Sequence, residues 1–558
     1  MPARRLQAAS SSEVERARVP FTFDGRRYEG VEGEPVAASL LAAGQRTLSR
    51  SFRFHRPRGL MCSTGQCGWC ECEVDGRPSV RTCRVPVRDG MVVRGEHAWP
   101  SVEHDLLRVL DLGSRFVPPT FYHHRFLRPR RLRKAYLEVI RWFGGRGRLG
   151  GGRPSLRQPR TLRHDAPEVL VVGGGRGGLL AAIGAAEIGA RAVILEAEAG
   201  AGPPDLLAEA RTLGVDVRTA TTATGWYDGM VTSIDAEAIW ELRPRAVVSA
   251  TGSYELVPAV DGSDRPGVLS ARLALRLAND YGVLAGERAL LVGGGEELEA
   301  AGASLRDAGA TVVGPVPTSG LRSIGGRGSV ASASFVDAAG AARRERVDLV
   351  VFGDRTPNLD LVLAAGGRLV WHDGRLCPQA DDVGRTSVSG LFVAGEAAGG
   401  SARGAAAEAQ ARRAGRAAGT FAREPGRIGE HTAGAATRAG DSPRSQSGGH
   451  PPAPGSARAV LCFCEDVRGW EIHAERAAGY ADPELIKRRT GALTGPCQGK
   501  YCLSAVTCAM NGSDIAATTV RREPGAVAAA TDEGIVLPTG RPPVRPIRVG
   551  DLVTEDPT

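Results

Sequence analysis

The sequence lacks any uninterrupted apolar run long enough to cross a membrane, and its N-terminus lacks the apolar core of a secretory signal. The longest apolar stretch, residues 169–186, is interrupted by a group of glycines around Arg176. That pattern predicts a strand, a glycine turn and a helix rather than a membrane span. We therefore expect a protein without a membrane span, located in the cytoplasm.

Aromatic residues are scarce, at 5%, and only three of the 71 basic residues are lysines. Hydrophobic residues still make up 42% and charged residues 24% of the 558 residues. This is an ordinary globular composition, and it excludes the fibrous and wholly disordered classes. At roughly 150 residues per domain, the length predicts three or four domains.

The net charge of +9 comes from one local patch. Between Arg125 and Arg163 the sequence has twelve Arg and one Lys but a single acid, Glu138, so the rest of the chain is slightly acidic. No nucleic-acid-binding motif accompanies the patch. We favour a subunit interface or a surface for an anionic cofactor over a nucleic-acid site.

Ten of the eleven cysteines fall in two clusters, at residues 62–83 and 462–508. They are not spread along the chain as a disulfide framework would be. Clustered cysteines in a cytosolic chain indicate metal or redox chemistry more often than disulfides. We expect Cys377 and Cys508 to be buried core residues.

The first cluster has the spacing C-x4-C-x2-C-x12-C, and its first three cysteines are spaced as in plant-type 2Fe–2S ferredoxins. The expected ligands are Cys62, Cys67, Cys70 and Cys83. Gly65 and Gly68 would let the loop fold around a cluster, and Cys72, in a predicted strand, is a non-ligand. Strands within 21–31 and a helix at 36–43 predict a small β-grasp domain. A zinc site is the alternative.

The second cluster combines a C-x-C pair with a C-x4-C pair after 32 intervening residues. These pairs can close one four-thiolate site formed by Cys462, Cys464, Cys497 and Cys502. We expect helices at 470–478 and 484–490, and a further helix opening at Cys502, where the helix dipole favours a thiolate. A second 2Fe–2S cluster is the first choice, and structural zinc stays open.

A dinucleotide fingerprint follows the predicted strand 169–172. The sequence reads G-x-G-x-x-G over Gly173, Gly175 and Gly178, then a helix, then a strand that ends at Glu196. The glycines would let the backbone approach a pyrophosphate at the helix N-terminus, and the acid would accept from ribose hydroxyls. The pattern predicts a bound dinucleotide. The alternative is a Rossmann-like turn without a ligand.

Two later motifs resemble those of two-dinucleotide flavoprotein reductases. Residues 390–398 resemble the late FAD-binding motif, and residues 250–252 resemble the A-T-G turn near FAD. The resemblance implies that FAD is also contacted by Thr251, Gly252, Gly395 and Glu396. Glu396 stands where that family usually has Asp.

A second nucleotide pattern, at 289–314, is degenerate. Leu298 replaces the third glycine, and the following strand ends in Gly314 rather than in an acid. Glu296 and Glu297 would lie beside the pyrophosphate, where negative charge is unfavourable. We expect a Rossmann-like domain here, but these features weigh against NAD(P) binding.

Several segments resemble the α-subunit of heterotetrameric sarcosine oxidase, and together they span most of residues 19–520. They are Ser51–Gly59, Arg115–Tyr122, Thr222–Asp228, Cys464–Asp466, Ile486–Thr490 and Gln498–Lys500. Unlike that subunit, this sequence carries the cluster cysteines and lacks a large folate-binding C-terminal domain. In both respects it is closer to the iron–sulfur subunits of hydrogen cyanide synthase, opine oxidases, and multi-subunit proline or hydroxyproline dehydrogenases.

The resemblance implies a multidomain α/β architecture. It combines a β-grasp 2Fe–2S ferredoxin-like domain, a two-dinucleotide Rossmann-like FAD/NAD(P) flavoprotein fold and a small helical BFD-like cysteine domain. The expected division is: a disordered N-terminus at 1–18, the ferredoxin-like domain at 19–98, a basic helical connector and linker at 99–166, the FAD-binding domain at 167–255 and 383–423, the NAD(P)-binding-like domain at 256–382, a flexible linker at 424–458, the BFD-like domain at 459–520 and an extended Arg/Pro tail at 521–558.

The resemblance also implies a role. The chain would be the electron-transfer subunit of an amine or amino-acid dehydrogenase or oxidase, with substrate oxidised on a D-amino-acid-oxidase-like flavoprotein partner. No residue here is identified as a catalytic base, and a further small subunit, FMN at a partner interface, the substrate and the electron acceptor are left open. The alternatives are a self-contained NAD(P)H-dependent FAD reductase and a non-catalytic metal-carrier scaffold.

Overall fold

The computed structural model describes most of the chain. The described residues are 4–6, 17–62, 64–113, 130–143, 159–372, 375–400, 404–424, 457–480, 482–511, 543–545, 547 and 552. The predicted disordered N-terminus (1–18), flexible linker (424–458) and Arg/Pro tail (521–558) lie mostly outside them, as does much of the predicted connector at 99–166.

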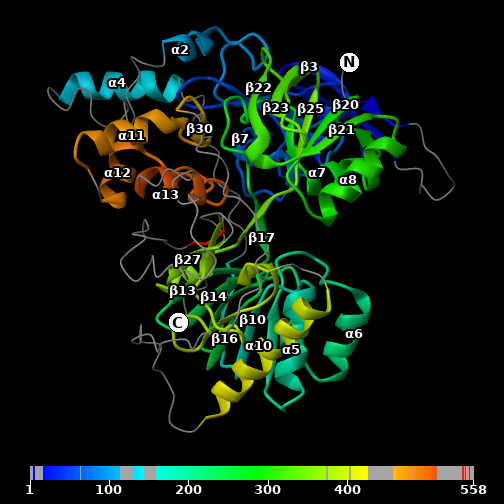
Figure 1. The fold of residues 1–558 in the computed structure, drawn as a ribbon, viewed down its shortest axis with the longest axis vertical. Helices are drawn as coiled ribbons and strands as arrows, with labels where there is room; N and C mark the ends of the chain where they lie inside the picture. Colours follow the sequence, from blue (N-terminus) through cyan, green and yellow to red (C-terminus); the bar gives the residue numbers. More distant parts are fainter. Residues whose placement is uncertain are drawn as a thin grey trace. The chain divides into compact units, whose positions relative to one another are not determined.

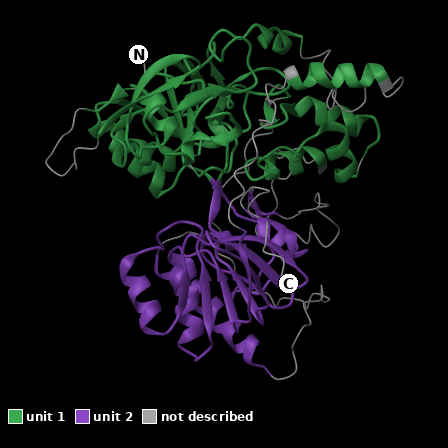
Figure 2. Cartoon of the chain, turned by 180° about the vertical axis from the view of Figure 1, so that it is seen from behind, with its two compact units in different colours: residues 1–152, 255–354, 450–526 green, residues 153–254, 355–449, 527–558 purple. Residues whose placement is uncertain are grey.

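Two compact units make up the chain, each assembled from segments far apart in the sequence (Figure 2). Unit 1 consists of residues 1–152, 255–354 and 450–526, and unit 2 of residues 153–254, 355–449 and 527–558. The predicted domain boundaries divide the chain more finely and remain predictions.

A five-stranded mixed sheet in unit 1 carries the first cysteine segment. Its strands run in the order β3-β2-β8-β6-β7 and pack on one helix. The elements are β2 (Arg18–Phe23), β3 (Arg26–Val31), α1 (Val36–Ala42), β6 (Glu71–Val74), β7 (Arg77–Arg81) and β8 (Val92–Gly95). Phe21 and Phe23 alternate with polar residues along β2 and are buried in the core, as a half-buried strand requires. This is the β-grasp arrangement predicted from the sequence.

The second sheet of unit 1 is parallel and Rossmann-like. Its strands run in the order β18-β25-β20-β21. In the sequence, helix α7 follows β18 and helix α8 follows β20 (Figure 1). The elements are β18 (Val268–Ser270), α7 (Ala271–Asn279), β20 (Arg288–Val292), α8 (Glu296–Asp307), β21 (Thr311–Val316) and β25 (Leu349–Phe352). One continuous apolar cluster joins this sheet to the β-grasp sheet, so the two share a core.

Smaller pieces complete these two parts of unit 1. An antiparallel sheet, two short strand pairs and several short helices are attached: β22 (Leu321–Gly325), β23 (Ser332–Val336), β24 (Ala342–Glu345), β1 (Arg4–Arg5), β19 (Val283–Leu284), β4 (Ser49–Arg50), β5 (Pro57–Arg58), η1 (Thr82–Arg84), η2 (Leu106–Arg108), α2 (Val109–Leu112) and η4 (Thr318–Gly320). The basic connector contributes α4 (Arg130–Phe143), whose described side chains are mostly exposed.

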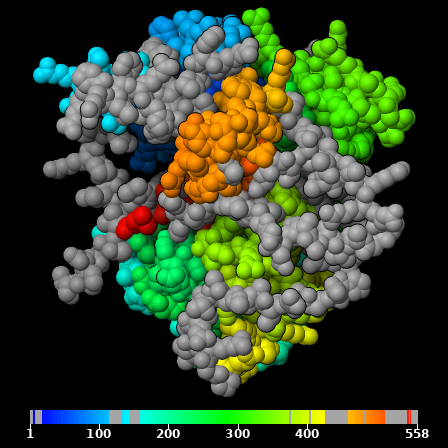
Figure 3. Space-filling model, turned by 60° about the vertical axis from the view of Figure 1, so that its left-hand side comes forward, coloured from blue at the N-terminus to red at the C-terminus, as the bar shows by residue number. Residues whose placement is uncertain are grey.

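The second cysteine segment forms a small helical body, drawn in orange in Figure 3. A short antiparallel pair precedes three helices: β30 (Val460–Cys462), β31 (Val467–Arg468), α11 (Gly469–Ala477), α12 (Pro483–Thr490) and α13 (Leu503–Asn511). Asp482 caps α12 by accepting from the amide of Leu485, and Gly491 ends it in the left-handed conformation. The helices predicted at 470–478 and 484–490 are confirmed within a residue or two, and the helix expected after the last ligand begins one residue beyond Cys502.

Unit 2 is built on a five-stranded parallel sheet with the order β12-β11-β10-β16-β29. Its strands and main helices are β10 (Val169–Val172), α5 (Arg176–Ala186), β11 (Ala192–Leu195), α6 (Pro204–Thr212), β12 (Asp216–Arg218), β16 (Ala246–Ser249), β29 (Leu391–Val393) and α10 (Ala405–Arg423). Every residue of the central strands β10, β11 and β16 is buried, which explains their continuous apolar sequence.

The rest of unit 2 is mostly antiparallel. A second sheet has the order β13-β14-β15-β9. Its strands are β9 (Thr161–Asp165), β13 (Thr222–Tyr227), β14 (Met230–Ile234) and β15 (Ala238–Leu242). The short elements that come later in the chain are β26 (Arg355–Pro357), α9 (Asp360–Ala364), β27 (Leu369–His372), β28 (Arg375–Pro378) and η5 (Gly395–Ala398). Among the helices that the structure describes, none combines the length and apolar character that a bilayer crossing demands.

Candidate redox centres and dinucleotide site

The first four candidate ligands come from a loop and a short helix of the β-grasp domain. Cys62, Cys67 and Cys70 lie between β5 and β6, and Cys83 lies in η1, directly after β7. All four side chains are buried. Their sulfurs meet in pairs, Cys62 with Cys67 and Cys70 with Cys83, through side-chain hydrogen bonds. Two thiolates for each of two irons is the donor set of a 2Fe–2S cluster.

The loop is shaped by two glycines, as the sequence predicted. Gly65 and Gly68 have φ values of +74° and +75°, a region that disfavours other residues. The turns aim backbone amides at sulfur: the Thr64 amide donates to Cys62 Sγ at 3.4 Å and the Trp69 amide donates to Cys67 Sγ at 3.5 Å. Such donors stabilise a thiolate ligand.

The thiols of Cys62 and Cys67 have pKa values shifted in opposite directions. Burial alone would raise the pKa of the Cys62 thiol, but hydrogen bonds with Cys67, Thr64 and Tyr501 outweigh it and hold that pKa well below its usual value. Burial, together with Cys62, raises the pKa of Cys67 well above the usual value. Because a metal ligand must be deprotonated, metal binding at this pair displaces the remaining proton.

Cys72 is placed differently from the four candidate ligands. It lies in β6, and its thiol donates to the backbone carbonyl of Leu48 at 3.3 Å. Burial and the negative charge of Cys70 raise its pKa well above the usual range, so it is a neutral thiol. This placement fits the non-ligand role predicted from its strand context.

The second group of candidate ligands frames the helical body. Cys462 ends β30, Cys464 follows two residues later, and Cys497 and Cys502 precede α13. Hydrogen bonds connect Cys464 with Cys497 and Cys462 with Cys502, and Cys497 also contacts Cys502. The bonds from Cys464 and Cys502 hold the pKa of Cys497 well below its usual value.

The sulfurs of the first group therefore form two pairs, and those of the second form a row in which Cys497 joins the two pairs. Within the described part of the chain, no three His, Cys, Asp or Glu side chains are spaced to hold a single metal ion. The structure nonetheless brings the eight predicted ligands together in two groups of four. The remaining cysteines, Cys377 and Cys508, are buried core residues, as expected.

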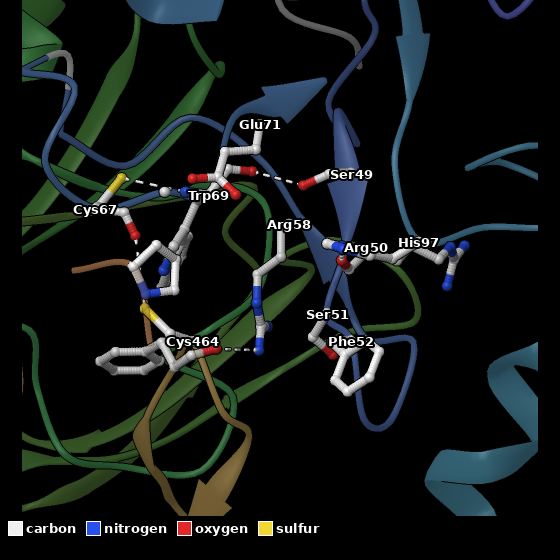
Figure 4. A pocket seen from close by; sticks show the side chains of 13 residues that line it. Ser49, Arg50, Ser51, Phe52, Arg58, Cys67, Trp69, Glu71, His97 and Cys464 are labelled. Atoms are coloured by element: carbon white, nitrogen blue, oxygen red, sulfur yellow. Dashed lines mark hydrogen bonds between the residues drawn. The ribbon is translucent and has the colours of Figure 1, made fainter. Parts of the chain in front are cut away.

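The two cysteine groups adjoin, which the sequence did not predict. Cys464 Sγ lies 3.9 Å from the carbonyl oxygen of Cys67, 397 residues earlier in the chain (Figure 4). The rings of Trp69 and Phe463 meet edge to face with their centroids 5.2 Å apart. Both sites therefore belong to one packed block of unit 1.

A buried charge network holds this block together. Arg58 donates to Asp264 and to Asp466, with both N–O distances 2.6 Å, and also to the carbonyl oxygen of Phe463. Arg56 shares Asp264. Arg58 and both carboxylates are almost fully buried, so the charges must be paired. Sequence reasoning missed this network because its members are separated by up to 408 residues.

A small cavity opens beside both cysteine groups (Figure 4). Its volume is about 40 Å³, enough for a few water molecules. The sulfur-bearing residues Cys67 and Cys464 both line it, together with Arg50, Arg58, Trp69 and His97. Water can therefore approach the edges of both groups from one opening.

The candidate FAD residues gather at one edge of the parallel sheet in unit 2. Gly173, Glu196, Thr251 and Gly395 each follow the carboxyl end of one of four adjacent strands, β10, β11, β16 and β29. That edge is where open α/β sheets bind ligands. The structure thus brings together all eight residues predicted from two distant segments of sequence: Gly173, Gly175, Gly178, Glu196, Thr251, Gly252, Gly395 and Glu396.

The first glycine turn fits a dinucleotide pyrophosphate. A Cβ atom on Gly178 would lie 1.8 Å from the carbonyl oxygen of Gly173, so that position tolerates only glycine. Space is open at Gly175, where the chain enters α5 and helix amides face outward. Glu196 accepts from the amides of Gly174 at 2.7 Å and Glu198 at 2.8 Å, which fixes its carboxylate beside the turn.

Glu396 is held by polar neighbours at the start of η5. The side chain pairs with Arg355 and accepts from Ser253 Oγ at 3.3 Å. Thr251 and Gly252 contact the segment that ends in Asn358, whose amide donates to the Gly252 carbonyl at 2.9 Å. The replacement of Asp by Glu at 396 therefore leaves a carboxylate at this edge, anchored by an arginine.

The degenerate nucleotide turn of unit 1 carries a carboxylate of its own. Asp354 Oδ1 accepts from the amide of Gly294 at 3.2 Å, and its other oxygen accepts from Thr318. Glu296 and Glu297 occupy the first turn of α8. Carboxylates thus lie at the turn and in the first turn of the helix, where negative charge is unfavourable for a pyrophosphate.

Two family models match the chain. The model described as a 2Fe-2S iron-sulfur cluster binding domain matches residues 16–98. The model described as the sarcosine oxidase A3 domain matches residues 456–555. The two matches cover the two cysteine segments.

Curated proteins extend the comparison. The sarcosine oxidase subunit alpha of Rhizobium meliloti (strain 1021) is 29% identical over 445 residues, which cover 68% of this chain and 43% of that protein. The hydrogen cyanide synthase subunit HcnA of Pseudomonas aeruginosa is 35% identical over 83 residues, which cover 15% of this chain and 79% of that protein. The chain spans less than half the length of the sarcosine oxidase subunits that it matches.

One solved structure shares the fold over nearly the whole chain. L-proline dehydrogenase from P. horikoshii superposes with a TM-score of 0.64 and 20% sequence identity, over 97% of this chain and 98% of that one. This chain therefore shares its fold with a solved structure over nearly its whole length.

Proposed function

This chain belongs to the sarcosine oxidase α-subunit-like family, and from that premise we propose that it is the FAD- and iron–sulfur-containing electron-transfer subunit of a multi-subunit amine or amino-acid dehydrogenase or oxidase. The substrate class is sarcosine-, proline- or opine-type. The observation that carries this proposal is that two groups of cysteine side chains, buried except for the half-buried Cys464, adjoin in one packed block. Neighbouring redox centres are what an electron-transfer subunit needs.

In this proposal the cysteines are the metal ligands. Cys62, Cys67, Cys70 and Cys83 hold one 2Fe–2S cluster, and Cys462, Cys464, Cys497 and Cys502 hold a second. At the second site the four thiols contact one another in a row, and a 2Fe–2S cluster is the proposed occupant, with structural zinc as the alternative. The clusters supply one-electron chemistry, and the chain orients their ligands and limits their contact with water.

The parallel-sheet edge of unit 2 is the proposed FAD site. The glycine turn would hold the pyrophosphate, Glu196 would accept from ribose hydroxyls, and Glu396 would contact another polar part of the cofactor. FAD supplies two-electron chemistry when bound. The carboxylates of Glu196 and Glu396 are already fixed by backbone amides and by Arg355, so they are oriented before the cofactor arrives.

A D-amino-acid-oxidase-like flavoprotein is the proposed partner, and it oxidises the carbon–nitrogen bond. We also propose a cytoplasmic location, which is supported by eleven cysteines that form no disulfide. The alternative function, an NAD(P)H-dependent reductase, requires nucleotide at the degenerate turn. The position of Asp354 at that turn counts against it.

An anaerobic titration of the purified chain tests the proposal. We expect iron near four atoms and FAD near one per chain, no bleaching of the flavin absorbance by NADH, and full bleaching by dithionite. Rapid bleaching by NADH would put the reductase alternative ahead. A preparation that holds neither flavin nor iron would refute the proposal.

Coexpression tests the partner. The chain is produced together with a D-amino-acid-oxidase-like flavoprotein encoded beside it, and complex formation is measured by size-exclusion chromatography. We expect one stable complex that reduces the iron–sulfur absorbance when the matching amine is added. A chain that remains alone with every such candidate would argue against a subunit role.

A further inference from the structure

Tyr501 belongs to the second cysteine segment but reaches the first. It precedes Cys502 in the sequence, and its side chain is only 3% exposed. Its hydroxyl oxygen lies 3.2 Å from Thr64 Oγ1 in the first cysteine loop, and it is also hydrogen-bonded to Cys62. A side chain supplied by one site therefore contacts a candidate ligand of the other.

The direction of these hydrogen bonds is fixed by chemistry. A tyrosine phenol carries its proton near neutral pH, so the Tyr501 hydroxyl is able to donate. Thr64 donates to Cys62 Sγ from its hydroxyl at 3.3 Å and from its amide at 3.4 Å. The tyrosine hydrogen therefore reaches the sulfur of Cys62 either directly or through the hydroxyl of Thr64.

We propose that Tyr501 is a positioning residue by which the second cysteine site sets the reduction potential of the cluster held by Cys62, Cys67, Cys70 and Cys83. This inference rests on the proposed function, because it requires the cluster at the first site. Adding an electron makes a cluster more negative, and donors to its sulfur ligands stabilise that charge. Removing such a donor therefore lowers the potential.

The backbone fixes Tyr501 relative to the candidate ligands of the second site. Tyr501 is adjacent to a candidate ligand, Cys502, and follows Cys497 by four residues. The turn that brings Cys497 and Cys502 together also fixes the tyrosine ring, through the amide of Cys502 donating to the Gly499 carbonyl at 3.0 Å. The backbone fold of the second cysteine segment thus places the donor that adjusts the first site.

The test is an EPR-monitored redox titration of the full chain with both clusters. Tyr501→Phe removes the hydroxyl and keeps the ring, so packing is preserved. Tyr480→Phe is the matched control, because that ring lies on Arg489 of the same helical body, 4.0 Å from the guanidinium carbon. We expect Tyr501→Phe to lower the equilibrium constant for reduction of one cluster about tenfold, or about 59 mV for a one-electron couple. Tyr480→Phe should shift neither cluster.

A second variant identifies the cluster and the route. Cys464→Ser should leave only the first cluster, and in that background the Tyr501→Phe shift should persist. Thr64→Val, which removes the intermediate hydroxyl, should also lower the potential of that cluster, and the double variant should shift it by less than the sum.

The outcomes separate this inference from the proposed function. If the unaltered chain binds two clusters and Tyr501→Phe shifts neither potential, the inference is wrong and the proposed function stands. If the shift falls on the second cluster, the inference is also wrong. If the unaltered chain binds no iron at the first site, the proposed function fails, and the inference fails with it.

Discussion

The thiol of Cys464 donates to the backbone carbonyl of Cys67, with sulfur and oxygen 3.9 Å apart. The contact joins two loops that belong to different sheets and lie almost four hundred residues apart in the sequence. It places the two groups of paired sulfurs next to each other in unit 1. Each prediction below follows from this arrangement, from the charges that support it, or from the dinucleotide turn of unit 2.

Cys67→Ser should remove the first cluster and leave FAD bound. A serine oxygen is a poor iron ligand, and loss of the Cys67 sulfur breaks the pair with Cys62. Iron should fall from about four to about two atoms per chain, with unchanged flavin absorbance. Cys72→Ser is the control, because that buried thiol donates to the Leu48 carbonyl and is not a candidate ligand. Unchanged iron in Cys67→Ser would disprove the ligand assignment.

Cys464→Ser should decide which metal the second site holds. The variant loses the sulfur that pairs with Cys497. We expect metal analysis to show a loss of about two iron atoms per chain and no change in zinc. Cys508→Ser, at a buried position in α13, should retain both irons. Loss of one zinc atom with constant iron would instead establish a structural zinc site.

Arg58→Met should destabilise unit 1 strongly. The change leaves Asp264 with Arg56 alone and removes the arginine that bridges Asp264 and Asp466. Both carboxylates are buried. Removing one member of a buried ion pair costs about 3 to 5 kcal/mol in the free energy of unfolding. Urea unfolding followed by tryptophan fluorescence measures the change. Arg88→Met, which breaks an exposed pair with Asp75, should cost less than about 0.5 kcal/mol.

Asp264 should make stability fall in acid. Burial alone would raise its pKa, but Arg56 and Arg58 outweigh burial and hold that pKa far below the ordinary value of 3.8. The unfolded chain therefore takes up this proton first as the pH falls. The stabilisation is complete above about pH 5 and is lost progressively below about pH 4.

Asp264→Asn provides the measurement for that pH dependence. Its free energy of unfolding should be lower than that of the unaltered chain at pH 7, and the gap should narrow towards pH 3. Because acid also releases iron, the difference between the two proteins at each pH is the relevant quantity. A gap that widens in acid would contradict the charge assignment.

Gly178→Ala should abolish FAD binding and leave the iron content unchanged. The added Cβ atom would meet the Gly173 carbonyl oxygen at 1.8 Å, so the turn must open. Gly200→Ala is the control within unit 2, because a Cβ atom there meets nothing within 4 Å. Flavin released by denaturation, measured by fluorescence, should be near zero in the first variant and near one per chain in the second. Retained flavin in Gly178→Ala would place FAD elsewhere.

The sequence by itself determined the local features of this protein. Cysteine spacing picked out both sets of candidate ligands, and Gly65 and Gly68 marked the turns of the first cysteine loop. The strand–glycine–helix pattern at Gly173 predicted the dinucleotide turn. Helix α12 follows from an Asp cap, a proline in its first turn and a terminal glycine. These features depend on neighbours within a few residues, so periodicity and backbone preference suffice to find them.

Only the tertiary structure decided how these parts meet. Nothing in the spacing of Cys67 and Cys464 indicates that they touch, and nothing near Tyr501 indicates that its hydroxyl serves Cys62. The pairing of Arg58 with two distant carboxylates is equally invisible in the sequence. Such contacts arise because a shared apolar core draws remote segments together, and buried charges and hydroxyls must then find partners wherever the packing places them.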